Sequence, residues 1–462
     1  MFLNRFDELG HLEKVWKTDS ARFIIVYGRR RIGKTELLRQ FSRDKPHVFF
    51  SSDLSSEKEQ LRQFTEKIHA TSGEAFLADH PFGSWEALLR YVFDHLAEKI
   101  PLIIIDEFPY LCAENPALPS ILQKIWDEKG KDSNIFLILC GSYMSFMEKE
   151  VLGGKSPLFG RRTGQMLLDP IRFEHLPLFF PNYSKTDRVY AYAVLGGTPA
   201  YLRRFNDHRS IEQNVMEEIL NKNEMLYGEP RFLLMEELRD PSFYFLILKA
   251  ISFGRNHLNE IVQEIGVSDR PKVSKYLSVL KELRLVEREV PVTEDKPHKS
   301  RKGIYRIKDP FFRFWFRYVY PNFSFLEEND VRYVWDEKIE PSLDSFAGPV
   351  FESVCMEAMK KMNRENRLPF KAARMGRWWE GAVEIDIVAL DGRGGFLFCE
   401  CKWSRKMMGK KVLNDLVQKT EKFPGAEKKY FGLFSRSGFR KELREWARER
   451  EDVLLLDYDP HS

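Results

Sequence analysis

The first part of the chain alternates short apolar runs with amphipathic stretches, and this pattern predicts a parallel sheet flanked by helices. The apolar runs contain few polar residues, as expected for strands buried on both faces. We expect strands at Phe23–Tyr27, His47–Phe50, Leu102–Ile105, Ile135–Cys140 and, with a weaker pattern, Gln165–Leu168. Residues 1–170 are therefore predicted to form one α/β domain.

After residue 170 the pattern becomes helical, and residues 171–230 are predicted to form a small helical lid that follows the sheet domain. Residues 231–322 predict three short helices, two strands around a polar turn, and an aromatic connector. This order is typical of a winged helix-turn-helix. The helices are expected at Phe243–Ser252, His257–Ile265 and Pro271–Leu283, the strands at Arg284–Val290 and Gly303–Ile307, and the connector at Phe311–Asn322.

Residues 346–462 predict a further α/β unit, so the fold class is a multidomain α/β protein. A helix, two strands, a second helix and a third strand follow one another. Their expected bounds are Phe351–Lys361, Glu384–Leu390, Gly395–Lys402, Val412–Phe423 and Lys429–Phe434.

The composition is that of a folded, water-soluble protein, with 43% hydrophobic and 31% charged residues in a chain of 462. The formal net charge of +4 neither requires nor excludes nucleic acid, because a basic face on one domain can be balanced by acidic faces elsewhere. No apolar run has the length of a membrane span. The five cysteines include no CxxC pair, so we interpret them as reduced core residues. We expect a cytoplasmic protein without a membrane partner.

Residues 28–35 read Gly-Arg-Arg-Arg-Ile-Gly-Lys-Thr, which matches the phosphate-binding pattern GxxxxGK[ST] between a predicted strand and a predicted helix. Glycines let the backbone curl so that amide groups face phosphate oxygens, and the helix adds the positive end of its dipole. Lys34 would reach the β- and γ-phosphates, and Thr35 would bind Mg²⁺. The predicted nucleotide-binding residues here are Gly28, Arg29, Arg30, Arg31, Ile32, Gly33, Lys34, Thr35 and Glu36.

Acidic and polar residues follow the later strands of the same domain. Asp106 would hold Mg²⁺, and Glu107 would polarise the attacking water. Ser142, after the fourth strand, would sense the γ-phosphate or simply cap the strand. Arg161 or Arg162 would act as an arginine finger within one subunit or across two, or would belong to a solvated basic loop.

Residues 1–230 resemble the archaeal-type ATPases of the AAA-related P-loop class. The resemblance rests on the entry segment Phe2–Leu9, the phosphate loop, the Asp106-Glu107 pair and the box Gly196-Gly-Thr-Pro-Ala-Tyr-Leu202. It implies that the entry segment lies near the nucleotide base, that the box belongs to the helical lid, and that the nucleotide is ATP. We therefore expect an ATPase core in residues 1–170 with ATP and Mg²⁺ as cofactors.

The predicted winged helix carries basic and polar side chains that suit phosphates or base edges. On the third helix these are Lys272, Ser274, Lys275 and Ser278. The polar turn, which would be the wing, adds Lys296, His298, Lys299, Arg301 and Lys302. DNA is the expected partner and RNA is an alternative, although winged helices also dock proteins or act as spacers.

Charged residues interrupt two apolar strands of the C-terminal unit. Side chains alternate across a strand, so Glu384 shares a face with Asp386, and Glu400 shares a face with Lys402. If the strands pair, Asp386, Glu400 and Lys402 converge. The two carboxylates would hold a divalent metal, and the lysine would position water for attack on a phosphodiester. Glu352 and Gln418 are further candidates from the flanking helices; the alternative is a half-exposed sheet with ordinary surface charges.

This arrangement, over residues 346–440, resembles the PD-(D/E)xK nuclease superfamily, with Ile385-Asp386 where Pro-Asp is usual. Together with the ATPase half, the chain resembles a family that pairs an archaeal-type ATPase with a nuclease-like domain. Two functions remain open. One is an ATP-driven enzyme in which ATP turnover gates DNA binding or Mg²⁺-dependent cleavage. The other is an ATP-dependent regulatory switch in which ATP binding controls assembly, for example into a homo-oligomer, and the catalytically silent C-terminal domain only binds a partner.

Overall fold

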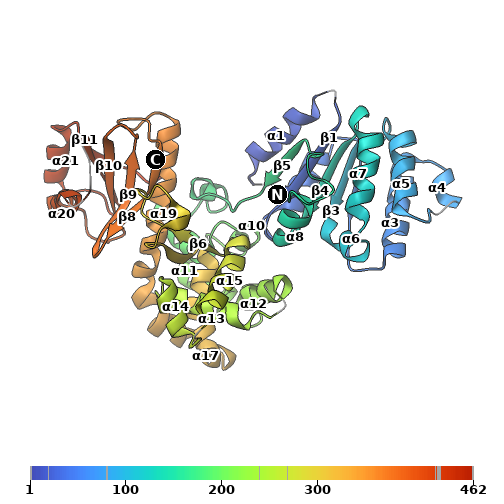
Figure 1. Cartoon of the computed structure of the whole chain (residues 1–462). Helices are drawn as coiled ribbons and strands as arrows, with labels where there is room; N and C mark the ends of the chain where they lie inside the picture. The colour runs from blue at the N-terminus through green and yellow to red at the C-terminus, as the bar shows by residue number, and fades with distance from the viewer. Residues whose placement is uncertain are drawn as a thin grey trace. The chain divides into compact units, whose positions relative to one another are not determined.

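The computed structural model describes residues 3–18, 20–79, 82–238, 240–267, 269–421, 423 and 428–459. The chain folds into two compact units, Met1–Pro170 and Ile171–Ser462 (Figure 1). The segment 171–230, predicted as a lid after the sheet domain, is part of the second unit. All five cysteines are buried and free, as predicted. Within the described residues, no helix combines the length and apolar character that crossing a membrane requires.

The first unit contains the predicted parallel sheet of five strands, in the order β2-β3-β4-β1-β5. Its strands are β1 (Arg22–Tyr27), β2 (His47–Ser51), β3 (Leu102–Asp106), β4 (Phe136–Gly141) and β5 (Gly164–Leu167). Every residue of β3 and β4 is buried, which agrees with their uninterrupted apolar sequence. Because β4 lies between β1 and β3, the segments that follow these three strands are neighbours at one edge of the sheet.

Helices cover both faces of this sheet (Figure 1). On one face, Leu12 of α1 (Phe6–Trp16) and Phe41 of α2 (Lys34–Ser42) join a buried apolar cluster with alternate residues of the strands. On the other face, aromatic pairs attach α3 and α7, for example Phe50 with Phe64 and Phe23 with Trp126. The remaining helices have the bounds α3 (Glu57–Ser72), α4 (Phe76–Asp79), α5 (Trp85–Tyr91), α6 (Phe108–Glu114), α7 (Leu118–Glu128) and α8 (Met144–Phe146).

The second unit begins with helices that pack onto its later parts. Their bounds are α9 (Lys185–Leu195), α10 (Pro199–Leu202), α11 (Ile211–Glu218) and α12 (Met225–Glu237). Helix α9 packs against α16 (Pro310–Phe314) and α19 (Leu343–Arg364). The two glycines between α9 and α10 permit this packing. A Cβ on Gly196, whose φ is +64°, would lie 3.0 Å from Pro310, and a Cβ on Gly197 would lie 2.0 Å from the carbonyl oxygen of Ile171.

Three helices and a hairpin follow, at the predicted positions. They are α13 (Ser242–Ser252), α14 (Leu258–Glu264), α15 (Arg270–Glu282), β6 (Val286–Glu289) and β7 (Ile304–Ile307). The three helices contact one another, and β6 pairs antiparallel with β7. The aromatic connector is α16 and the turns after it, with buried Phe311, Trp315 and Tyr318; α17 (Phe323–Glu327) and α18 (Val331–Val334) lead on to α19.

The C-terminal part of the second unit is a mixed sheet with the order β12-β11-β10-β9-β8. Its strands are β8 (Arg374–Glu380), β9 (Val383–Leu390), β10 (Gly395–Lys402), β11 (Lys428–Ser435) and β12 (Val453–Leu456). Strand β9 pairs antiparallel with both β8 and β10, whereas β10, β11 and β12 run parallel to one another. Helices α20 (Lys410–Glu421) and α21 (Lys441–Arg448) cover one face, and α19 covers the other (Figure 1). Strands β8 and β12 and helix α21 were not predicted.

Candidate functional sites

The phosphate loop lies between β1 and α2, as its sequence predicted. A Cβ on Gly28 would lie 2.7 Å from the carbonyl oxygen of Leu168, so only glycine fits there. Gly33 starts α2 with a φ of +92°, and Arg31 also adopts a positive φ of +64°. These left-handed residues curl the backbone ahead of the helix N-terminus, which is the arrangement that presents amide groups to an anion.

The side chain of Lys34 is directed back into the loop. Its Nζ donates hydrogen bonds to the carbonyl oxygens of Gly28 at 2.9 Å and Arg29 at 3.0 Å. Lys34 is only 5% exposed, so its charge is held inside the loop and not in solvent. An ammonium group fixed at this place can meet the β- and γ-phosphates of a bound nucleotide.

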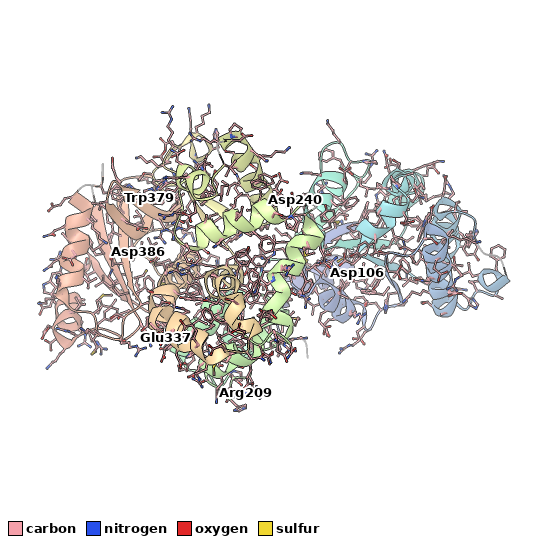
Figure 2. All side chains as sticks on the ribbon, turned by 90° about the horizontal axis from the view of Figure 1, so that it is seen from below. Asp106, Arg209, Asp240, Glu337, Trp379 and Asp386 are labelled. Atoms are coloured by element: carbon pink, nitrogen blue, oxygen red, sulfur yellow. The ribbon has the colours of Figure 1, made fainter. Side chains whose placement is uncertain are left out.

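Thr35 and Asp106 face one another from α2 and the end of β3. Thr35 Oγ1 donates a 2.7 Å hydrogen bond to Asp106 Oδ2. Asp106, in the first unit (Figure 2), is 2% exposed. A hydroxyl and a carboxylate oxygen so close together form a donor set that suits Mg²⁺, which takes few protein oxygens and the rest from phosphate and water. The residues present therefore fit the metal that the sequence predicted.

Glu107 is held at both its backbone and its carboxylate. Its φ is +52°, an uncommon conformation for a residue other than glycine. Ser142 binds Glu107 Oε2 through its backbone N at 3.1 Å and its Oγ at 2.8 Å. Ser52 Oγ donates to the carbonyl oxygens of Asp106 at 3.0 Å and Glu107 at 2.5 Å. Ser142 was predicted from the sequence, whereas Ser52, just after β2, was missed.

The entry segment contacts the phosphate loop through Arg5. Arg5 Nη2 donates to the carbonyl oxygen of Ile32 at 2.9 Å, and its Nη1 binds Glu8 at 2.9 Å. The arginine is 7% exposed and has a φ of +83°. Phe2 lies outside the described residues. The resemblance had placed this segment near the base, and the contact with Ile32 ties it to the loop itself.

The other predicted residues of the loop serve the surrounding structure. Ile32 is buried in the core beneath α2, and Glu36 is in the first turn of that helix, where a negative charge is favourable. Arg30 donates a 2.6 Å hydrogen bond to the hydroxyl group of Tyr110 on α6. Arg29 contributes its carbonyl oxygen to Lys34.

Arg161 and Arg162 make contacts within their own part of the first unit. Arg161 forms an ion pair with Asp127 on α7 at 3.0 Å. Arg162 donates to the carbonyl oxygen of Leu152 at 3.3 Å and lies over the ring of Phe159. These contacts are those of the basic loop that was the alternative to an arginine finger. The finger stays a prediction that needs a partner or a rearrangement.

In the C-terminal sheet, Asp386 is on β9 (Figure 2), one residue beyond the last residue of β9 that pairs with β10. Strands β9 and β10 pair as far as Ile387 opposite Cys399. Asp386 Oδ2 then accepts a 2.8 Å hydrogen bond from the backbone N of Cys401. Burial, followed by the negative charges of Glu352 and Glu400, raises the pKa of Asp386 to about 7. The predicted convergence of these carboxylates is therefore present.

Glu400 is buried and is bound by two lysines. Lys402 Nζ contacts its Oε1 at 2.5 Å, and Lys419 Nζ contacts its two oxygens at 3.0 and 2.8 Å. Burial acts to lower the pKa of Lys402, but the hydrogen bond and charge of Glu400 outweigh it and raise that pKa. The prediction of Gln418 as the partner from the following helix was wrong by one position. Gln418 is on the exposed face of α20, while Lys419 points to the sheet.

Arg377 on β8 was missed by the sequence analysis and joins two predicted acids. Its guanidinium binds both Glu352 of α19 and Glu384 of β9. Although burial acts in the opposite direction, the positive charge of Arg377 lowers the pKa of Glu384. Among the residues that the structure describes, no group of three or more His, Cys, Asp and Glu side chains is arranged to hold a metal. Asp386 and Glu400 supply two carboxylates, the ligand type that Mg²⁺ prefers.

The predicted nucleic-acid interface is exposed to solvent. On α15, Lys272, Lys275 and Ser278 are exposed, and Lys272 Nζ lies 4.5 Å from the ring centroid of Phe243. Ser274 is half-buried. The residues of the predicted wing that are exposed are Lys296, His298, Lys299, Arg301 and Lys302.

The fold and the phosphate loop define a P-loop ATPase domain. Residues 2–205 match a family described as an ATPase domain predominantly from Archaea, and residues 315–414 match DUF234, described as archaeal and bacterial proteins of unknown function. The uncharacterized protein MJECL04 of Methanocaldococcus jannaschii is 36% identical over 472 aligned residues, which span 100% of both chains. The chain belongs to this family of archaeal-type ATPases that carry a C-terminal DUF234 domain.

Two further proteins are similar over part of the chain. The uncharacterized ATP-binding protein MJ0423 of the same organism is 51% identical over 45 residues, 10% of this chain and 76% of that protein. The solved structure of the Walker-type ATPase Paby2304 of Pyrococcus abyssi has a TM-score of 0.51 and 22% identity, covering 68% of this chain and 96% of that one. This second likeness is one of fold.

Proposed function

We propose that the chain is an ATP-hydrolysing protein that acts on nucleic acid, in which ATP turnover gates DNA binding or metal-dependent cleavage by the C-terminal domain. The observation that carries the proposal is the meeting of Asp386, Glu400 and Lys402 where β9 and β10 separate. Such a cluster, in one chain with a P-loop ATPase domain and a basic helix–hairpin segment, suits a nucleic-acid enzyme.

In the ATP site, Lys34 would leave the carbonyl oxygens of the loop and bind the phosphates. Thr35 and Asp106 would hold Mg²⁺, which supplies charge neutralisation on the phosphates. Glu107 would orient the attacking water and accept its proton. Ser142 now donates its Oγ to Glu107, so a γ-phosphate that attracts this hydroxyl would release the carboxylate for that role.

The helix α15 and the predicted wing would dock the nucleic acid. Exposed Lys272 and Lys275 would meet phosphates or base edges, and Lys299 and Arg301 would lie along the backbone. In the C-terminal domain Asp386 and Glu400 would hold a divalent cation, which would polarise the phosphodiester. To bind the cation, Glu400 must give up its ion pair with Lys402, and Lys402 would then be free to position the attacking water.

Gating by ATP is tested by measuring the affinity of the full-length protein for labelled duplex DNA without nucleotide, with ADP and with a non-hydrolysable ATP analogue. The affinity should differ between nucleotide states by about tenfold, a typical coupling of roughly 1.4 kcal/mol. The Lys34→Ala variant should lose this difference. DNA and RNA binding that is absent in every state, with ATP hydrolysis intact, would contradict the proposal.

A second candidate function is favoured by the two lysines on Glu400. With Lys402 and Lys419 both bound to it, Glu400 is neutralised without a metal. A C-terminal domain that keeps these ion pairs would be catalytically silent and would bind a partner, with ATP as the regulatory signal. The Lys419→Gln variant separates the two candidates, because freeing Glu400 should raise metal binding only if the site is a metal site.

A further inference from the structure

The C-terminal domain carries a concentration of positive charge that the cluster around Glu400 does not use. The segments 402–411 and 436–450 contain 11 lysines and arginines against 3 glutamates, a formal charge of +8 in 25 residues. The whole chain carries only +4, so the remaining residues are net acidic. This charge is therefore a local feature and not a property of the overall composition.

Backbone contacts hold these two segments side by side. Met408 N donates to the carbonyl oxygen of Gly438, and Arg440 N donates to that of Met408, both at 2.9 Å. The same pair of segments continues to the end of β10, where Arg436 N donates to the carbonyl oxygen of Lys402 at 3.1 Å. The basic surface is thus built directly onto the strand that carries Glu400 and Lys402.

Six side chains of this surface are exposed and, within the described residues, form no ion pair; we call them the basic strip: Lys406, Lys410, Lys411, Arg440, Arg444 and Arg448. Arg444 and Arg448 are four residues apart on α21 and therefore share one side of the helix, and Arg440 is the residue that precedes its first turn. A Cβ on Gly409 would lie 3.3 Å from the side chain of Arg440, so this arginine lies over the loop of the other segment; a Cβ on Gly438 would lie 3.6 Å from Arg444 within the same segment. Unpaired cations gathered on one surface repel one another unless an anionic partner binds.

We infer that the basic strip is a docking surface for the phosphodiester backbone of nucleic acid, leading to the cluster of Asp386, Glu400 and Lys402. The inference rests on the proposed function and names a second contact surface beyond α15 and the wing. Long lysine and arginine side chains that can follow a backbone are the usual means of binding phosphates. Because the strip begins four residues after Lys402 in the chain, a strand bound there would pass close to that residue.

A membrane surface is the competing anionic partner, and the structure favours nucleic acid. A helix that binds membranes presents a wide apolar face to the lipid. The apolar residues Leu443 and Ala447 of α21 are instead buried against the sheet. Trp446 lies between the cations of Lys410 and Arg450, at 5.8 and 4.7 Å from its ring. Met407, beside Lys406, is an exposed apolar side chain, but one such residue does not make the wide apolar face that lipid requires.

The test compares the full-length protein with the double variant Arg440→Gln/Arg444→Gln. Lys441→Gln is the matched control, since Lys441 is on the same helix but is paired with Glu445 at 3.7 Å. Binding of labelled duplex DNA is followed by fluorescence anisotropy over a series of salt concentrations. Removing two phosphate contacts should weaken binding at least fivefold and reduce the slope of log K against log salt by about 2. Circular dichroism and the melting temperature should be unchanged, because both arginines are exposed.

Each outcome decides the matter. If the double variant binds DNA more weakly and with a smaller slope of log K against log salt, while the control is unchanged, the basic strip binds nucleic acid as proposed. Equal binding by the double variant and the wild type overturns the strip, while the proposed function stands if Lys299→Gln/Arg301→Gln weakens binding. Vesicles of phosphatidylcholine and phosphatidylserine that bind in a strip-dependent way, when DNA does not, overturn it in favour of a membrane. No DNA or RNA binding by the wild type overturns both proposals.

Discussion

The hydroxyl group of Ser142 donates a 2.8 Å hydrogen bond to the carboxylate of Glu107, and the backbone N of Ser142 adds a second bond to the same oxygen. The contact follows from the strand order, because β4 brings Ser142 in between the phosphate loop and the end of β3. In the proposed function, Ser142 would respond to the γ-phosphate and restrain Glu107, the group that would activate water.

Substitution of Ser142 should therefore affect both the position of the Glu107 carboxylate and the response of the site to the γ-phosphate. We expect Ser142→Ala to lower kcat by about 10²- to 10³-fold, the usual range for loss of a hydrogen-bond donor that acts in the transition state, with little change in ATP affinity. Glu107→Gln should lower kcat more, by about 10²- to 10⁴-fold. Steady-state ATPase assays and nucleotide titrations measure both. If the Ser142→Ala enzyme is as active as the wild type, Ser142 has no role in ATP hydrolysis.

Lys34 should be essential for ATP turnover. Lys34→Ala removes the buried ammonium group that, in the proposed function, would bind the phosphates, so we expect loss of detectable ATP hydrolysis and at least a tenfold weaker nucleotide affinity, about 1.4 kcal/mol. Lys131→Ala is a suitable control because Lys131 is exposed after α7. Normal hydrolysis by the Lys34 variant would show that the ATP site lies elsewhere.

The glycines between α9 and α10 should matter for stability. A Cβ at residue 197 would lie 2.0 Å from the carbonyl oxygen of Ile171, so Gly197→Ala forces the backbone apart and should cost about 1–3 kcal/mol. In Gly348→Ala, inside α19, the new Cβ meets nothing within 4 Å, and helix propensity favours alanine by about 1 kcal/mol. Thermal unfolding should therefore shift down for the first variant and stay level or rise for the second.

Burial of Glu357 should make stability depend on pH. Burial is the main cause that raises the pKa of Glu357 to about 7, although it accepts hydrogen bonds from Phe173 N at 3.0 Å and Tyr192 OH at 3.3 Å. The unfolded chain has an ordinary glutamate pKa of about 4.3, so the folded state holds the proton more tightly. Stability should accordingly fall as pH rises from about 4.3 to 7. Denaturant titrations of Glu357→Gln should show a weaker fall, and an unchanged profile would disprove the assignment.

The sequence predicted the regular elements well because their patterns are local. All five strands of the first sheet lie within one or two residues of the expected bounds, and the phosphate loop is where the glycines and Lys34 indicated. The acids Asp386 and Glu400 also converge as the alternation of β9 and β10 predicted.

What the sequence did not predict depends on contacts between distant residues. Ser52 binds Glu107, 55 residues away in the chain, and Arg377 binds Glu352, 25 residues away. No local sequence spacing could therefore have predicted these two contacts. Lys419 takes the place expected for Gln418 because the exact rotation of α20 on the sheet is set by the packing of Leu413 and Leu416. Strand β8 was missed because it mixes charged residues with two adjacent tryptophans, Trp378 and Trp379, and is mostly half-exposed, so its sequence gives no clear alternation.

The central claim is that the cluster in the C-terminal domain acts on nucleic acid under the control of ATP. The most direct measurement is incubation of the full-length protein with plasmid and single-stranded DNA, with Mg²⁺ or Mn²⁺, in the presence and absence of ATP. The account predicts cleavage that depends on ATP and is lost in both Asp386→Ala and Lys402→Ala, while ATP hydrolysis by these variants is retained. Intact DNA under every condition, with ATP hydrolysis unimpaired, would contradict it and leave an ATP-dependent regulatory protein with a silent C-terminal domain.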